Sequence, residues 1–281
     1  MLISSVLPRL PTIGESLLAS NFIFSPGGKG CNQALAASFA DTDVYFITKV
    51  GTDHFSDYAI NFMNSSKIYK VYLSNERNAN GTATILVNEG TGDNVIAIYP
   101  GANMTMSSDE ITIQKEAIII LMSYFCSSKQ IIPLCNKRSH WRKKTVSRSL
   151  LTRHPIMISS TNLFRMLIIS PPMKQKAGLL SGIDVHDLES AKRAAEAIHN
   201  KGVKNTVITL GSKGSLAFDG KKFIHSPAFP AVVKNTAGAG DAFNGALASG
   251  LAKGKSLESA LCYASAFASL AVGDKQCFRH A

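Results

Sequence analysis

Alternating helix and strand patterns in the second half of the chain constrain the fold most strongly. A helix is expected from about Asp187 to Asn200, followed by a strand from Thr206 to Leu210. A turn at Gly211 to Gly214 precedes a strand from Ser215 to Phe218, and another helix opens near Gly240. This alternation predicts a three-layer α/β/α domain with a mostly parallel sheet. Ligands of such domains bind at the carboxyl ends of the strands.

The first part of the chain shows the same kinds of pattern. Gly30 to Ala40 is small and apolar at helical spacing, and Val44 to Val50 reads as a strand. Two strands are expected within Thr82 to Tyr99, joined by a Gly-rich turn at Asn88 to Asn94. The 281 residues, 45% of them hydrophobic, are enough for one large α/β domain with a small appended layer.

The net charge of +11 comes from one segment. Of the 30 Lys and Arg residues, 11 lie between Ala117 and Lys176, which contains no Asp or Glu, leaving 19 to match the 19 acidic residues. This segment also holds the only tryptophan, Trp141, and has no sustained period of a helix or a strand. It can be read as a basic nucleic-acid arm, but a simpler origin is given below, and no nucleic-acid partner is expected.

Cysteine usage and hydropathy favour an intracellular protein. The five cysteines have neither the spacing of a disulfide framework nor a CxxC metal motif. The longest aliphatic run, near Ala117 to Met122, is far shorter than the ~20 residues that cross a bilayer. We therefore expect no membrane role.

The strongest chemical signal is the run NTAGAGDAFNGA from Asn235 to Ala246. Small residues at Ala237 to Gly240 let backbone N–H groups converge at a helix start, where the helix dipole favours an anion such as phosphate. Asp241 follows directly and is suitably placed to accept a proton from an attacking hydroxyl. A Gly-rich helix start with an acidic first turn is the alternative interpretation.

Two further loops are rich in glycine. GGKGCNQ, Gly27 to Gln33, lacks the Walker spacing, but its Lys29, Asn32 and Gln33 carry donors that suit sugar hydroxyls. TLGSKG, Thr209 to Gly214, ends an apolar strand and could hold nucleotide phosphates.

Together these three motifs resemble the ribokinase, or PfkB, family of carbohydrate kinases, in the family's order and at about its spacing. The resemblance extends to Pro11 to Glu15, Lys49 to Asp53 and Gly81 to Asn103. It implies a ribokinase-like α/β fold in a single kinase domain, 1–281, with a small β lid formed by strands near 16–24 and 82–99. The lid would close over the sugar and exclude water.

The resemblance also implies roles for individual residues. Asp241 would be the catalytic base and a substrate contact. The remaining expected positions are the anion hole at Ala237, Gly238, Ala239 and Gly240; the sugar contacts at Gly28, Lys29, Gly30, Cys31 and Asn32; the nucleotide contacts at Thr209, Leu210, Gly211, Ser212, Lys213, Gly214, Gly240 and Ser265; and a monovalent-cation site at Asn235, Ala237 and Ala271.

The implied activity is ATP-dependent phosphorylation of D-ribose to ribose 5-phosphate, with Mg²⁺ and K⁺ as cofactors. Fructose, adenosine and 2-keto-3-deoxygluconate are alternative substrates within the family, and a non-catalytic pseudogene product is an alternative of another class. We expect a homodimer formed through the lid, located in the cytoplasm, with the nucleus as a second compartment.

The chain departs from the family pattern in four places. Met1 lies about where the family's first strand ends, so the chain is expected to be truncated there and to lack the Asp that binds the sugar. Asn235 replaces an Asp common in ribokinases, and the sequence diverges after Val272. The basic segment lacks the family's Asn-Pro-Ala-Pro and Thr-Pro-Asn-Glu.

A shifted reading frame explains the basic segment. Pro172 to Gln175 is encoded CCN ATG AAR CAR, and reading two nucleotides later gives NAT GAA, which allows Asn and forces Glu. The same offset lets Met166 to Pro172 read Val-Asp-x-hydrophobic-Thr-Pro-Asn, and lets Leu151 to Pro155 read Asn-Pro-Ala-Pro. We infer a frameshifted translation between about residues 121 and 176. The chain as written is accordingly expected to lack central strands, to fold poorly and to be inactive.

Overall fold

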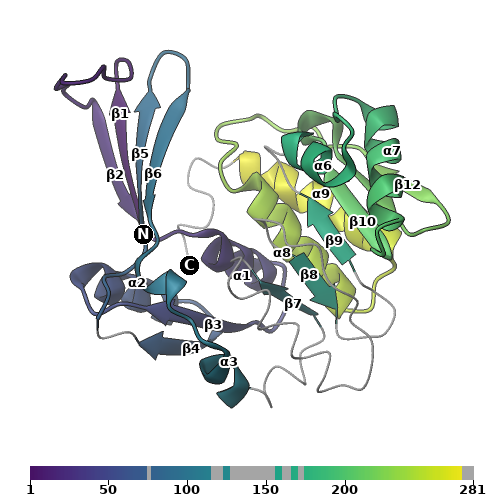
Figure 1. Ribbon diagram of the computed structural model, residues 1–281, viewed down its shortest axis with the longest axis horizontal. Coiled ribbons are helices and arrows are strands. Elements are labelled where there is room, and N and C mark those ends of the chain that lie inside the picture. The colour runs from purple at the N-terminus through teal and green to yellow at the C-terminus, as the bar shows by residue number, and fades with distance from the viewer. Residues whose placement is uncertain (75–76, 115–122, 127–155, 160–165, 170–173, 274–281) are drawn as a thin grey trace. The chain divides into compact units, whose positions relative to one another are not determined.

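The computed structural model describes residues 1–74, 77–114, 123–126, 156–159, 166–169 and 174–273 (Figure 1). The chain divides into two compact units. The first unit comprises Met1–Cys31 and Tyr45–Met106, and the second comprises Asn32–Val44 and Ser107–His280.

A four-stranded sheet, which we call the lid sheet, stands out in the first unit (Figure 1). Its strands, in spatial order, are β2 (Asn21–Ser25), β1 (Leu2–Leu7), β5 (Thr82–Asn88) and β6 (Asn94–Tyr99). β1 and β5 are parallel, and the two outer pairs are antiparallel. The hairpin expected within 82–99 is therefore confirmed, with its turn where the glycines predicted it.

Two details of the lid differ from the expectation. The expected strand near 16–24 begins only at Asn21, because Ser16 to Ser20 carries no strand pairing. β1 was not predicted, since LISSVL places its apolar residues in adjacent pairs rather than in alternation.

The rest of the first unit is a parallel strand pair with one helix. It contains β3 (Tyr45–Val50), α2 (His54–Asn64), β4 (Tyr69–Ser74) and the 3₁₀ turn η1 (Gly101–Met104). The Asp53 carboxylate caps α2 by accepting the N–H of Ser56 at 3.0 Å, and its other oxygen accepts the N–H of Asn80 at 3.0 Å. The Asp53 carboxylate therefore caps α2 and also holds the segment around Asn80 that leads into β5.

The second unit holds most of the helices. Its described elements are α1 (Lys29–Phe39), of which Asn32 onward belongs to this unit, α3 (Ser108–Ile113), β7 (Ser123–Cys126), β8 (Ile156–Ser159), β9 (Met166–Ile169), α6 (Lys174–Ser181), α7 (Leu188–His199), β10 (Asn205–Thr209), η2 (Gly211–Lys213), β11 (Ser215–Phe218), β12 (Phe223–Ser226), α8 (Ala239–Ala252) and α9 (Leu257–Val272).

The sheet β12-β11-β10-β9 separates two helical layers. Ile208 and Leu216 point into a core with α6 and α7, whereas their neighbours Val207 and Ala217 point into a core with α8 and α9. This alternation, with period two, buries both faces of the sheet. The expected three-layer α/β/α architecture is confirmed in this unit.

Parts of the basic segment are described, and one expectation about it is wrong. The written residues Met166–Ile169 form β9, which pairs in parallel with β10 from Asn205 to Ile208. The segment therefore does supply a strand beside β10, because a run of four consecutive apolar residues is typical of a strand in a parallel sheet. β7 and β8 pair antiparallel. The positions of the missing Asn-Pro-Ala-Pro and most of the segment's basic residues lie outside the described residues, as does the divergent end after 273.

None of the helices in the described ranges combines the length and apolar character that a membrane crossing requires.

Candidate active site

The predicted phosphate-binding turn forms the start of α8. Gly238 is the N-cap residue and has a left-handed backbone, with φ of 87°. A side chain is strained in that conformation, which accounts for glycine at this position. The first N–H groups of a helix have no acceptor within the helix, so this turn presents donors at the positive end of the dipole.

Asp241 lies in the first turn of α8, and the residue as a whole is only 8% exposed. The side-chain amide of Asn32 donates to its Oδ2 at 3.0 Å, and that of Gln33 donates to its Oδ1 at 2.9 Å. Each oxygen therefore has an amide donor from α1. The structure thus brings predicted residues Asn32 and Asp241 together across 209 positions of sequence.

Close packing of α1 against α8 makes these contacts possible. A Cβ placed on Gly245 would lie 2.5 Å from the Cβ of Ala36 and 2.6 Å from the carbonyl oxygen of Gln33. Only a residue without a side chain allows this approach. The small residues that predicted α1 as a helix thus also set its distance from α8.

Two of the four expected anion-hole residues already use their N–H groups. Ala237 donates to the side-chain oxygen of Asn235 at 2.9 Å, and Ala239 donates to the carbonyl of Thr236 at 3.3 Å. In the described part of the chain, the N–H groups of Gly238 and Gly240 have no acceptor, so they are free to bind a phosphate. The assignment of all four residues to an anion hole stays a prediction.

The predicted nucleotide loop follows β10 directly. Gly211 and Gly214 both have positive φ, 64° and 88°, and the N–H of Leu210 bonds to the carbonyl of Gly214 at 2.7 Å. A Cβ on Gly214 would lie 2.1 Å from the carbonyl oxygen of Ser226 in β12. The loop is therefore a tight turn held against the sheet edge, at the carboxyl end of a strand.

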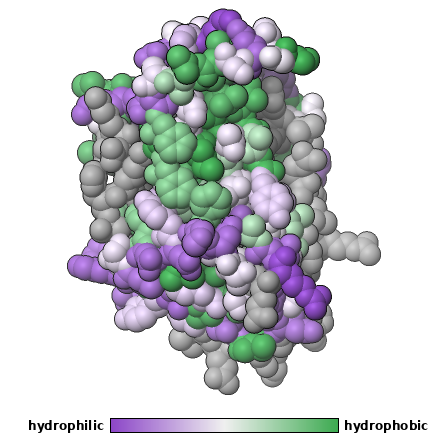
Figure 2. All heavy atoms as spheres, turned by 90° about the vertical axis from the view of Figure 1, so that its left-hand side faces the viewer, coloured by the Kyte–Doolittle hydropathy of each residue, from purple (hydrophilic) through white to green (hydrophobic). Residues whose placement is uncertain are grey.

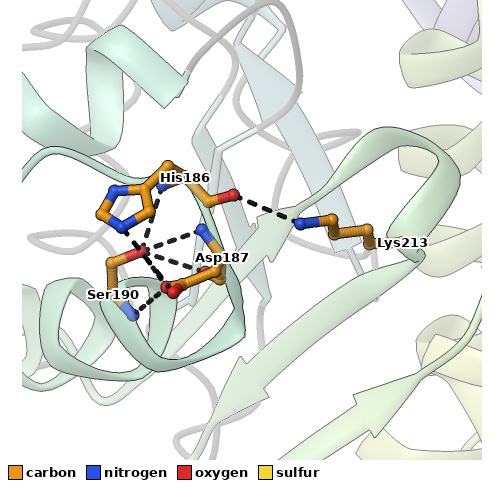
Figure 3. Close-up of polar contacts among 4 residues, drawn as sticks. All are labelled: His186, Asp187, Ser190 and Lys213. Carbon is orange, nitrogen blue, oxygen red and sulfur yellow. Dashed lines mark hydrogen bonds and ion pairs between the residues drawn. The ribbon is translucent and has the colours of Figure 1, made fainter.

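Lys213 of this loop points toward the start of α7 (Figure 3). Its ammonium group donates to the carbonyl oxygen of His186 at 3.4 Å. Beside it, the hydroxyl and the N–H of Ser190 donate to Asp187, and these hydrogen bonds, with the nearby charges of His186 and Lys213, hold the pKa of Asp187 below its ordinary value. The capping box of α7 and the nucleotide loop thus lie side by side.

Two predicted nucleotide contacts are buried. The side chain of Leu210 is 7% exposed and packs in the core with α6 and α7. Ser265, in α9, is 4% exposed and its hydroxyl lies 3.0 Å from that of Ser215. A contact from Leu210 to a nucleotide would therefore come from its backbone.

The remaining predicted sugar contacts belong to the first unit. Gly28 has φ of 108° and an open environment, and the side chain of Lys29 is exposed at the start of α1. Gly30 follows in the first turn, and the sulfur of Cys31 lies 3.3 Å from that of Met63. The loop therefore presents backbone and one ammonium group.

The expected cation loop is tied to the end of α9. The N–H groups of Lys234 and Asn235 both donate to the carbonyl of Val272, at 2.8 and 3.2 Å. Asn235 and Ala237 thereby lie near the last turn of α9, which contains Ala271. Among the described residues no cluster of His, Cys, Asp and Glu suited to a metal ion occurs.

Sequence reasoning assigned Gln33 to sugar hydroxyls, and the structure corrects this. Gln33 is 2% exposed, and its donor is bonded to Asp241. Its partner lies 208 positions away. The sequence feature that could have indicated this hydrogen bond is the run of small residues in α1, which packs against Gly245 of α8.

Comparisons with known proteins agree with this geometry. The chain is 33% identical to the ribokinase of Staphylococcus aureus over 228 residues, which cover 81% of this chain and 75% of that one. It is 29% identical to the deoxyribokinase of Salmonella typhi over 269 residues, covering 95% and 88%. Arabidopsis thaliana ribokinase, solved with ribose and ATP, superposes with a TM-score of 0.73 at 25% identity and covers 98% of this chain and 90% of its own.

The family model for pfkB carbohydrate kinases matches residues 8–279, which include both compact units. The lid sheet, the α/β/α layers and the glycine-rich start of α8 with its carboxylate account for that match in physical terms. This chain belongs to the PfkB family of carbohydrate kinases, a family of phosphotransferases.

Proposed function

We propose that an intact form of this chain, with residues 121–176 read two nucleotides later, transfers the γ-phosphoryl group of ATP to O5 of D-ribose, giving ribose 5-phosphate and ADP. The observation that carries the proposal is the position of Asp241, a buried carboxylate three residues after the left-handed Gly238 at a helix start. A base and an anion-binding turn lie within one helical turn of each other there.

In this mechanism, Asp241 accepts the proton of the ribose 5-hydroxyl as its oxygen attacks the γ-phosphorus. The O5–P bond forms, the bond from phosphorus to the bridging oxygen breaks, and ADP leaves. The N–H groups of Gly238 and Gly240 would stabilise the negative charge of the transferring group. Positioning and electrostatics supply most of the catalysis in phosphoryl transfer.

The cofactors follow from the same residues. Kinases of this family use ATP with Mg²⁺, and some bind K⁺. The nucleotide loop, Thr209 to Gly214, would hold ATP, and Mg²⁺ would come bound to the phosphates, where it neutralises their charge. Neutral carbonyl oxygens of the Asn235 loop and of Ala271 would fit a monovalent cation, since K⁺ is coordinated by carbonyl dipoles. The hydrogen bonds from the N–H groups of Lys234 and Asn235 to the carbonyl of Val272 bring this loop to the end of α9.

The lid sheet supports a proposal of self-association. Paired strand positions share a face, so Ile23, Ile85 and Ile96 lie together, as do Ala83 and Ile98 in the next row on that face. Ile96 and Ile98 are 51% and 72% exposed. Figure 2 shows hydrophobic side chains gathered over this part of the first unit. A second copy of the chain, forming a homodimer through the lid, would cover them.

2-Deoxyribose is a second candidate substrate, favoured by the 29% identity to a deoxyribokinase. A site that bonds the 2-hydroxyl would reject the deoxy sugar strongly, whereas an apolar site would discriminate weakly. The cytoplasm is the proposed compartment.

A substrate panel with labelled ATP tests the proposal on the version with residues 121–176 read two nucleotides later, because the written chain is expected to be inactive. Ribose, 2-deoxyribose, fructose, adenosine and 2-keto-3-deoxygluconate are compared by kcat/KM. Ribose is expected to be the best substrate. A higher kcat/KM for adenosine or for 2-deoxyribose would overturn the assignment to ribose.

A further inference from the structure

The side-chain amide of Gln33 is buried, and within the described ranges only its nitrogen has a hydrogen-bond partner. Its Nε2 donates to Asp241 at 2.9 Å, while its Oε1 is buried and has no hydrogen-bond partner among the described residues. Because a carboxylate only accepts hydrogen bonds, the amide cannot be turned to exchange these atoms. The orphaned oxygen is a cost to folding, since a buried acceptor without a partner loses its hydration.

A purely structural role does not account for a glutamine here. An apolar side chain of the same size would pack between α1 and α8 without leaving a polar atom unsatisfied. What such a side chain would remove is the donor to Oδ1 of Asp241. The presence of Gln33 is therefore explained by what it does to that carboxylate.

We infer that Gln33 is a positioning residue for Asp241. Gln33 fixes the rotamer of the carboxylate through Oδ1, on a helix held rigidly by the Gly245 contact. Asn32 bonds the other oxygen but is only half-buried, so it remains accessible for a second contact. Gln33 therefore holds the Asp241 carboxylate in place, whereas Asn32 can exchange its hydrogen bond to Asp241 for one to a ligand. The role in turnover rests on the proposed kinase function.

The surroundings of Asp241 contain few competing charges. Within the described elements packed on it, α1 carries no charged side chain from Asn32 to Phe39, and Asp241 is the only charged residue of α8. In α9 the titratable groups are Glu258, Cys262 and Tyr263, all in the N-terminal half of the helix. Ala260 in that half lies next to Gly250, which is near the end of α8 that is distant from Asp241. Lys234 is exposed on the preceding loop.

Gln33→Met is the informative variant because it keeps the length of the side chain and removes both the donor and the orphaned acceptor. Ser249→Ala is the matched control, since Ser249 also links α8 to the end of α1, by a 2.9 Å hydrogen bond to the carbonyl of Ala40, away from Asp241. Gln33→Glu retains length and polarity and provides a second test if Gln33→Met folds poorly.

Two measurements are made on the full chain. In the first, the ¹³Cγ signal of labelled Asp241, identified by its loss in Asp241→Asn, is recorded by NMR. Its chemical shift is expected to change in Gln33→Met, because Oδ1 of Asp241 loses a hydrogen bond, and also in Gln33→Glu, which replaces the amide donor. In Ser249→Ala the chemical shift is expected to stay unchanged.

In the second measurement, kcat and KM for ribose and ATP are compared in the version of the chain with residues 121–176 read two nucleotides later, because the written chain is expected to be inactive. Gln33→Met is expected to lower kcat at least ~10-fold with KM nearly unchanged, since the base loses its orientation, while Tm stays within about 3 °C. An unchanged Asp241 signal together with a fall in Tm would show that Gln33 is only structural. If the version with residues 121–176 read two nucleotides later turns over no sugar, the proposed kinase function fails, while the Asp241 signal still decides whether Gln33 positions the carboxylate.

Discussion

Gly245 of α8 lies so close to α1 that a Cβ on it would stand 2.6 Å from the carbonyl oxygen of Gln33. This contact fixes the distance between the helix that carries Asp241 and the helix that carries its two amide donors. The geometry of the candidate base therefore depends on a residue that touches no reactant.

Gly245→Ala is expected to force α1 and α8 apart and to destabilise the protein by about 1–3 kcal/mol, which exceeds the ~1 kcal/mol of helix propensity gained. Gly250→Ala, in the same helix, is the control, because its Cβ would meet the Cβ of Ala260 at 3.1 Å, a tight contact but a less severe one than those at Gly245. Urea denaturation measures both. Equal urea midpoints for the two variants would show that α1 and α8 can move apart at little cost in stability.

The nucleotide loop offers a similar pair of variants. Gly214→Ala combines strain at φ of 88° with a Cβ 2.1 Å from the carbonyl of Ser226, whereas Gly211→Ala meets open space at φ of 64°. Gly211→Ala is expected to cost about 1 kcal/mol, and Gly214→Ala clearly more. Gly214→Ala should also raise KM for ATP. Calorimetry and ATP-dependent kinetics check this, and a Gly214→Ala protein as stable as Gly211→Ala would contradict the described loop.

Asp53 predicts a dependence of stability on pH. Burial disfavours its charge, but hydrogen bonds from the Ser56 hydroxyl and from the N–H groups of Asn80 and Ser56 outweigh burial and hold its pKa below the ordinary value. The stabilisation is therefore fully present above about pH 4 and is lost as pH falls through the lowered folded value.

Asp53→Ala is expected to destabilise the chain by about 1–2 kcal/mol at pH 7, with the difference shrinking toward pH 2. Asp57→Ala, with a side chain 74% exposed in the same helix, should change little. Thermal unfolding between pH 2 and 7 measures both, and a constant deficit for Asp53→Ala at all pH values would refute the linkage.

Local patterns sufficed to predict much of the fold. The small-residue stripe predicted α1, the turn glycines predicted the β5–β6 hairpin, and Gly238 with Asp241 predicted the start of α8, because each depends on neighbours in sequence. β1 was missed since LISSVL has no strand alternation. The bond from Gln33 to Asp241 could not be foreseen, because it depends on how closely two distant helices pack.

The frameshift inference predicts a difference between two chains. In the second-frame version, the codons of residues 121–176 are read two nucleotides later, which restores Asn-Pro-Ala-Pro and Thr-Pro-Asn-Glu. This version is expected to phosphorylate ribose much faster than the written chain. β9 forms from the written residues, so the expected loss lies chiefly in phosphate and Mg²⁺ handling. Equal turnover by the two chains would refute the inference, and the transcript sequence checks it independently.

The most direct test of the account is transfer of the labelled γ-phosphoryl group from ATP to ribose, measured with Asp241 and with Asp241→Asn, in both the written chain and the second-frame version. If Asp241 is the base, the substitution lowers kcat at least ~10²-fold in the active form, with both KM values little changed. Transfer to ribose that continues undiminished in Asp241→Asn would contradict the account.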